Sequence, residues 1–226
     1  MPGWSRATLT QNEVAGPGLH RLTLEVPPGV ASVFHAPGQY HRVRAPSGED
    51  ATFAIASLPG EPRFEYLIRE TDGVAGEITA LKVGSSLKVG MPEGPGFPVE
   101  RAHARNLLLI GTGTGFAPLR SVILTISKHR KQYGEVHGAY GVLTPAHLAF
   151  GPELEGWASE AIHVTPTVSS VTPEWKGKVG MVQELLGSLP TQNAIAFLCG
   201  QPEMIHEVTH LLEQRGIPGD RVFVNF

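Results

Sequence analysis

The fold of this chain is decided by the stretch Leu107-Leu108-Leu109-Ile110-Gly111-Thr112-Gly113-Thr114-Gly115-Phe116-Ala117-Pro118. Its four leading apolar residues are typical of a parallel strand that is buried on both faces. The three glycines at alternate positions allow the backbone to turn tightly and to approach a ligand closely. The apolar pattern from Phe116 to His129 predicts a helix, whose free N–H groups and dipole favour negative charge. A strand, a glycine turn and a helix N-terminus in this order predict a cradle for a pyrophosphate.

Beyond residue 100 the pattern alternates between strands and helices. We expect strands at 106–110, 136–140, 162–165, 195–199 and 222–224, and helices at 117–130, 147–157, 181–188 and 202–215. The last helix is well marked, because Pro202 suits a first turn and Gly216 suits a left-handed cap just past the end. This alternation predicts a doubly wound parallel sheet, with ligands bound beyond the carboxyl ends of its strands.

The first hundred residues are rich in glycine and proline and alternate between apolar and polar side chains, as in the run from Arg21 to Val26. This period of two predicts short strands with one solvated face, and turns such as Ala36-Pro37-Gly38 separate them. We also expect a short helix at 76–81. The sequence therefore predicts a six-stranded antiparallel barrel over residues 1–100, followed by an α/β domain over residues 101–226.

Composition excludes several classes of function. The net charge is −3 with both signs scattered, which argues against a nucleic-acid surface. No apolar run is long enough to span a bilayer, and the first residues lack the apolar core of a signal peptide, so we expect a cytoplasmic location. The single cysteine, Cys199, cannot hold an iron–sulfur cluster or a structural zinc, and the ten histidines show no metal-ligand spacing. We therefore expect no metal site in this chain.

The order of motifs resembles that of the ferredoxin–NADP(H) reductase superfamily. A barrel is followed by the glycine segment 111–118, by Tyr140-Gly141, by Cys199-Gly200-Gln201-Pro202-Glu203-Met204 and by an aromatic C-terminus. The chain is especially similar to the plant fruit-protein-like branch, which shares the Ala54-Ile55-Ala56-Ser57 run and the Asn225-Phe226 ending. The resemblance implies a flavin on the barrel and a nicotinamide dinucleotide on the α/β half. It also implies hydride transfer between them and electron transfer onward to a partner protein.

The resemblance further implies which residues form the site. The dinucleotide residues would be Gly111, Thr112, Gly113, Thr114, Gly115, Pro118, Tyr140, Gly141, Gly200 and Met204. The flavin residues would be Tyr40, Phe53, Ala54, Ile55, Ala56, Ser57 and Gly76. Catalytic roles would fall to Cys199, beside the nicotinamide, and to the terminal Phe226, over the flavin face. From the residues alone, a small buried hydrophobe is the favoured interpretation of Cys199, and simple packing is an equal alternative for Phe226.

On the flavin side the chain departs from the family pattern. Ala51 and Ala54 stand where the family uses an arginine and a serine, and the run Gly73–Ile78 offers a phosphate no hydroxyl and a glutamate of the wrong sign. Two hypotheses follow. The first is an NAD(P)H–flavin oxidoreductase with FAD or FMN. The second is a reductase-like nucleotide-binding subunit or sensor that has lost its flavin.

Two further questions concern the dinucleotide and the electron acceptor. Thr167, Ser169 and Ser170 follow a predicted strand, but no cation comes before Lys176, so the sequence favours NADH over NADPH. Because this chain cannot hold an iron–sulfur centre, an electron-acceptor protein that carries one is a further expected partner.

Overall fold

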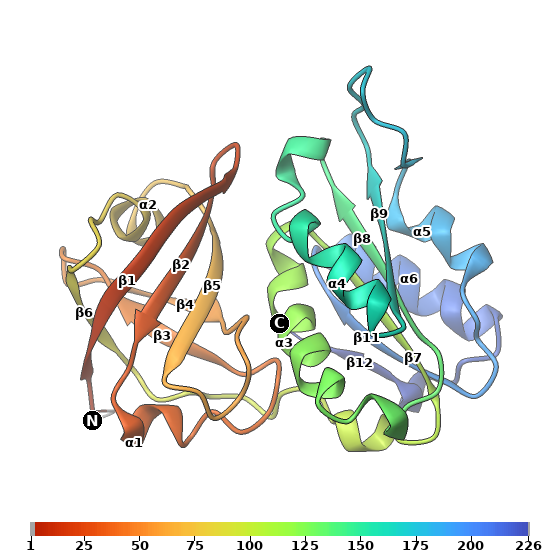
Figure 1. Cartoon of the computed structure of the whole chain (residues 1–226), viewed down its shortest axis with the longest axis horizontal. Coiled ribbons are helices and arrows are strands. Elements are labelled where there is room, and N and C mark those ends of the chain that lie inside the picture. The colour runs from red at the N-terminus through yellow and green to blue at the C-terminus, as the bar shows by residue number, and fades with distance from the viewer. Residues whose placement is uncertain (1–2, 226) are drawn as a thin grey trace.

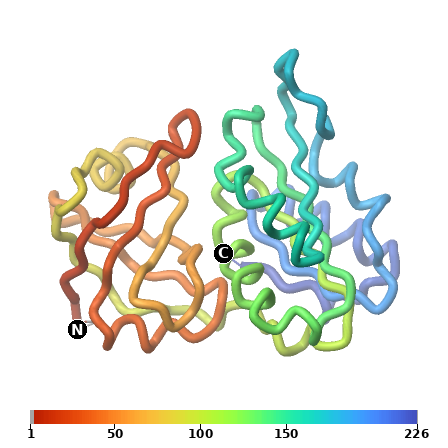
Figure 2. The backbone as a smooth tube through the Cα atoms, viewed as in Figure 1, coloured from red at the N-terminus to blue at the C-terminus, as the bar shows by residue number. Residues whose placement is uncertain are grey.

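The computed structural model describes residues 3–225, so the predicted role of Phe226 lies outside the described residues. Figure 1 shows two lobes side by side, the first half of the chain forming one and the second half the other. The backbone passes between the lobes once near residue 100, as the tube in Figure 2 shows. The 3₁₀ turns are η1 Val99–Ala102, η2 Gly113–Gly115, η3 Arg130–Gln132, η4 Pro145–His147, η5 Gly151–Glu153, η6 Leu186–Ser188 and η7 Gly219–Arg221.

The first lobe is a six-stranded sheet in the order β4-β3-β6-β1-β2-β5, with antiparallel pairing throughout. Its elements are β1 Ser5–Gly16, β2 Leu19–Glu25, α1 Pro28–Ala31, β3 Tyr40–Arg44, β4 Asp50–Ala54, β5 Arg63–Arg69, α2 Val74–Thr79 and β6 Ser86–Val89. The N–H of Ala56 donates to the carbonyl of Glu65 at 2.7 Å, which links the end of β4 to β5. The predicted antiparallel sheet and the short helix are therefore confirmed.

Alternating apolar residues fill the interior of this lobe, as the period of two predicts. Leu22 pairs with Tyr66 and Leu24 with Phe64 across β2 and β5, and all four side chains are buried. The same interior holds His41, whose ring stacks on that of Tyr66 and shares a hydrogen bond with its hydroxyl group. Burial lowers the pKa of His41 to about 4, because the charged imidazolium would lose its hydration.

The second lobe is a six-stranded parallel sheet in the order β10-β9-β8-β7-β11-β12. Its strands are β7 Asn106–Thr112, β8 Val136–Val142, β9 Ile162–Val168, β10 Lys178–Val179, β11 Ala194–Cys199 and β12 Val222–Val224. Its helices are α3 Phe116–Ser127, α4 Leu154–Ser159, α5 Val182–Leu185 and α6 Pro202–Gln214. The predicted doubly wound sheet is confirmed.

Helices cover both faces of this parallel sheet, which is why the run Leu107–Ile110 of β7 is apolar throughout. Leu107 and Leu109 pack with α3 and α4 in one core, and Leu108 and Ile110 pack with α5 and α6 in another (Figure 1). Gly216 follows α6 with φ +87°, which confirms the predicted left-handed cap.

The helix expected at 147–157 is wrong over most of its length. The turn η4 ends at His147, residues 148–150 are not helical, η5 spans Gly151–Glu153, and α4 begins only at Leu154. The proline at 152 provides the physical reason, because it disfavours helical backbone at Gly151 and has no N–H to donate. The two-residue strand β10 had no counterpart among the expected strands.

A polar network joins the two lobes. Arg120 of α3 donates to the carbonyl of Ala56 at 2.9 Å and contacts the carboxylates of Glu65 (3.2 Å) and Glu153 (2.7 Å). Arg21 of β2 contacts the same two carboxylates, each at 3.0 Å, which closes a ring of four charges across the interface. Because the Arg120 side chain is only 8% exposed, this ring fixes the barrel against the helix that follows the glycine turn.

Candidate nucleotide-binding site

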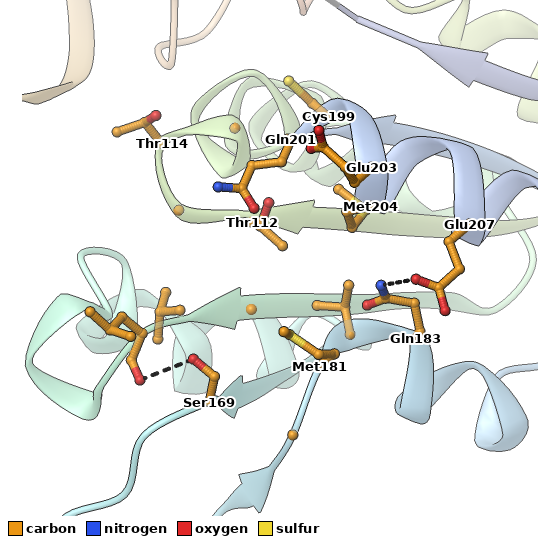
Figure 3. A pocket seen from close by; sticks show the side chains of 18 of the residues that line it. Thr112, Thr114, Ser169, Met181, Gln183, Cys199, Gln201, Glu203, Met204 and Glu207 are labelled. Carbon is orange, nitrogen blue, oxygen red and sulfur yellow. Dashed lines mark hydrogen bonds between the residues drawn. The ribbon is translucent and has the colours of Figure 1, made fainter.

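A cavity of about 910 Å³ lies beyond the carboxyl ends of β7, β8, β9 and β11. This is the place at which open α/β sheets bind ligands. Figure 3 shows side chains around it that come from segments far apart in the chain, such as Thr112, Ser169, Met181 and Cys199. The predicted site residues that line it are Thr112, Gly113, Thr114, Gly115, Gly141, Cys199, Gly200 and Met204. The structure thus brings together residues that are up to 92 positions apart (112 and 204) in the chain.

The glycines at the cavity allow the ends of β7 and β11 to pack closely against each other. A Cβ on Gly115 would lie 2.7 Å from both the carbonyl oxygen of Cys199 and the Cα of Gly200. A Cβ on Gly200 would collide with the hydroxyl of Thr112 and would lie 2.5 Å from the methyl carbon of Met204. Gly113 has φ +53°, a left-handed conformation that most residues avoid. Gly113 therefore shapes the turn, whereas Gly115 and Gly200 keep the tips of β7 and β11 in contact.

Two helices begin at the cavity, and their N-termini make its floor attractive to anions. The turn η2 leads directly into α3 at Phe116, and α6 begins at Pro202, just after Gln201 in the lining. Unpaired N–H groups and the helix dipole favour negative charge at both places. Glu203 and Glu207 of α6 also line the cavity, and Glu207 accepts a hydrogen bond from Gln183 at 2.7 Å (Figure 3).

Arg69 is the cation of the cavity lining, and sequence reasoning missed it. It stands at the end of β5, in the other lobe, and its Nη2 lies 3.4 Å from the place that a Cβ on Gly113 would take. Within residues 3–225 its exposed side chain takes part in no ion pair. In the sequence Arg69 is one more polar residue of an alternating strand, so nothing there could have identified it.

Cys199 lines the cavity, but its thiol is not reactive. The side chain is half-buried, and burial raises the pKa of the thiol to about 12. The thiol therefore stays protonated at neutral pH and is neither a thiolate nucleophile nor a base. If Cys199 contributes to catalysis, it does so through its position and shape.

Three of the predicted dinucleotide residues do not line this cavity. Tyr140 is fully buried and its ring stacks on that of Phe116, with the ring centroids 4.1 Å apart. Gly111 lies inside β7 with Leu119 against it, and Pro118 is buried in α3. These residues pack beneath the glycine turn and do not face the cavity. A strand that is buried on both faces presents only its end to a ligand.

The predicted flavin residues divide into two groups. Tyr40, Phe53 and Ala54, on the adjacent strands β3 and β4, are half-buried and retain exposed surface. Ile55 lies in the barrel core, and Ala56 and Ser57 belong to the contact between the lobes. The hydroxyl of Ser121 donates to the carbonyl of Ser57 at 2.6 Å, and the Ser57 hydroxyl accepts the N–H of Glu65 at 3.2 Å.

The last of the predicted flavin residues, Gly76, lines a separate, shallow hollow of about 760 Å³ at the start of α2. The other residues around this hollow are Glu70, Thr71, Asp72, Gly73 and Glu77. Three carboxylates therefore surround the place at which the family resemblance implied a flavin phosphate, and the charge of this lining does not fit such a group.

Comparisons with known proteins agree with this fold. The family described as "Oxidoreductase NAD-binding domain" matches residues 109–210. Ferredoxin–NADP reductase B of Sorangium cellulosum is 30% identical over 230 residues, which cover 92% of this chain and 91% of that protein. Sulfhydrogenase 1 subunit gamma of Pyrococcus furiosus is 33% identical over 83% of this chain and 66% of its own length. Fruit protein pKIWI502 of Actinidia deliciosa is 28% identical over 87% of this chain and 68% of its own length.

Among solved structures, a ferredoxin NADP⁺ reductase from Neisseria gonorrhoeae with bound FAD and NADP superimposes with a TM-score of 0.85. Its sequence identity is 18%, and the match covers 98% of this chain and 97% of that one. An antiparallel barrel packed against a parallel sheet with a glycine-lined cavity defines a pyridine-nucleotide oxidoreductase. The chain belongs to the ferredoxin–NADP reductase family. This membership supports the enzymatic hypothesis over the non-catalytic one.

No helix within residues 3–225 is long and apolar enough to cross a membrane. The same residues contain no group of three or more His, Cys, Asp or Glu side chains that could hold a metal ion.

Proposed function

We propose that this chain oxidises NADH and passes the electrons, by way of a flavin on the barrel, to an acceptor protein. The observation that carries the proposal is the cavity at the tips of β7 and β11, which Arg69 closes from the barrel side. One cavity is thereby lined by both lobes, as transfer between a ligand on each lobe requires. The family to which the chain belongs supports the same conclusion.

The dinucleotide would be held by backbone and by one cation. N–H groups for the pyrophosphate come from Gly113, Thr114 and the N-terminus of α3. Arg69 lies close enough to Gly113 to neutralise part of the charge of the pyrophosphate. The far end of the cavity is lined by Leu143, Ser169 and Met181, without a lysine or arginine. A 2′-phosphate would find no cationic partner there, which supports NADH rather than NADPH.

The flavin ring and the flavin phosphates fit this chain to different degrees. Tyr40 and Ala54, which lie opposite each other on β3 and β4 and are half-buried, suit one face of a planar apolar ring, whereas Phe53 packs against the barrel core. The carboxylates around α2 do not suit phosphates, and Ala51 and Ala54 supply neither charge nor hydroxyl. When bound, the flavin supplies the hydride chemistry, and the chain's own residues bind and orient the reactants.

The acceptor, the location and the domain division complete the proposal. An iron–sulfur protein is the class of acceptor that we propose, because the relative from Sorangium cellulosum is named a ferredoxin–NADP reductase. A cytoplasmic location and a division of the chain near residue 100, between β6 and β7, remain our proposals. Co-purification with a cysteine-rich protein and expression of residues 101–226 alone would test the acceptor and the division, and cell fractionation would test the location.

A direct test uses the purified chain with added flavin. Anaerobic titration with NADH should bleach the oxidised flavin band, and NADH should reduce a dye acceptor catalytically. Nucleotide-dependent thermal stabilisation without any dye reduction, at saturating riboflavin, FMN and FAD, would refute the proposed function and favour a binding module.

A further inference from the structure

The hollow at the start of α2 carries negative charge where a flavin phosphate would need positive charge. Glu70 and Asp72 are exposed on the loop between β5 and α2, and Glu77 projects from the helix itself. Glu77 is held in place, because its carboxylate accepts the backbone N–H of Ser47 at 3.0 Å. The hollow therefore carries three carboxylates, of which Glu70 lies 3.7 Å from the imidazole of His20.

The neighbouring strand does not compensate for this charge. Strand β4 contacts α2, and its Ala51 ends at a methyl group. The cations of the adjacent strand β3, Arg42 and Arg44, pair with Thr52 and Asp50 in the register and so face the side opposite to Ala51. Both guanidinium groups are engaged by the Asp50 carboxylate, at 3.5 Å and 3.1 Å, and both lie over the ring of Trp4.

The attraction left for a phosphate comes from the Thr71 hydroxyl and the backbone at the start of α2. A full helix dipole is equivalent to roughly half a positive charge at its N-terminus, and α2 has only six residues. Three unit negative charges around the same hollow outweigh it. The net interaction of the hollow with a phosphate is repulsive, and salt should weaken that repulsion because the carboxylates are largely exposed.

We propose that this chain holds a flavin by its ring alone, so that the flavin exchanges with solution and its phosphates weaken binding. The inference rests on the proposed function, because it takes a flavin as the ligand of the barrel. The ligands of that site would be flavins with or without phosphate groups on the ribityl chain, and riboflavin would bind at least as tightly as FMN or FAD.

Fluorescence titrations of the flavin-free full chain with riboflavin, FMN and FAD, in 20 mM and 300 mM NaCl, test the proposal. At low salt the Kd of riboflavin should be at least threefold lower than those of FMN and FAD, and the three values should converge at high salt. FAD binding at least tenfold tighter than riboflavin binding, or FMN binding that weakens with salt, would overturn it. Absence of binding by all three flavins would overturn the proposed function as well, whereas an FAD preference would leave that function standing.

Charge variants provide a second readout. Glu70→Gln combined with Asp72→Asn should lower the Kd of FMN at least threefold at low salt and leave that of riboflavin unchanged. Ala51→Arg should favour FAD over riboflavin by about tenfold. Glu13→Gln, at an exposed position of β1, is the matched control and should change neither value. Equal responses of FMN and riboflavin to the charge variants would contradict the proposal.

Discussion

Replacement of Arg69 provides the sharpest test of the dinucleotide site. Arg69→Ala removes the cation that lies beside Gly113 without touching the barrel core, because the side chain is exposed. A hydrogen bond to a charged group contributes about 1.5–3 kcal/mol, and solvent screening at an exposed site favours the lower end of this range. We therefore expect about a tenfold rise in the Kd of NADH, since 1.4 kcal/mol corresponds to a factor of ten.

The assay is isothermal titration of the flavin-free chain with NADH at two salt concentrations. Arg69→Lys keeps the charge but loses the planar fork of donors, so its Kd should fall between those of wild type and Arg69→Ala. Arg63→Ala, at the opposite end of β5 and equally exposed, is the matched control. If Arg69→Ala bound NADH as wild type does, with the same salt dependence, Arg69 would have no part in the site.

Three other predictions concern stability and shape. Burial lowers the pKa of His41 in the folded state to about 4 from the usual 6.5. The free energy of unfolding should therefore keep its full value above pH 6.5 and decrease as the pH falls toward 4. We expect wild type to lose about 2 kcal/mol between pH 7 and pH 4.5 in urea unfolding, and an equal loss in His41→Gln would refute this. Gly200→Ala should weaken NADH binding at least tenfold in the same titration, because a Cβ there would collide with Thr112 and Met204. Gly187→Ala, where a Cβ meets open space, should leave NADH binding unchanged. Equal NADH affinities of the two variants would contradict the proposed contact between the ends of β7 and β11. Arg120→Ala leaves the carboxylates of Glu65 and Glu153 paired with Arg21 alone, removes the hydrogen bond to the Ala56 carbonyl and should cost about 3 kcal/mol in urea unfolding. Exposed Lys82→Ala should cost less than about 0.5 kcal/mol, and a loss that small in Arg120→Ala would show that the charge ring does not hold the lobes.

Local sequence patterns predicted most of the helices and strands, and the helix at 147–157 was predicted wrongly. The run Leu107–Ile110 is apolar throughout because both of its faces are covered, so its strand could be predicted without knowledge of its neighbours. Gly216 marked the end of α6 because only a left-handed residue fits there. The expected helix at 147–157 failed because its apolar pattern was given more weight than Pro152, which disfavours helical backbone at Gly151, so that α4 begins only at Leu154.

The sequence by itself determined the two lobes, the glycine turn and the strand tips at Gly113 and Cys199. It did so because periodicity and glycine conformation are properties of short segments. Only the tertiary structure decided which side chains meet. Packing places Arg69 of β5 in the lining of the nucleotide cavity and buries Tyr140 in the core. It also places three carboxylates around the start of α2. Contacts between distant segments depend on how sheets and helices pack, and no local pattern in the chain records that packing.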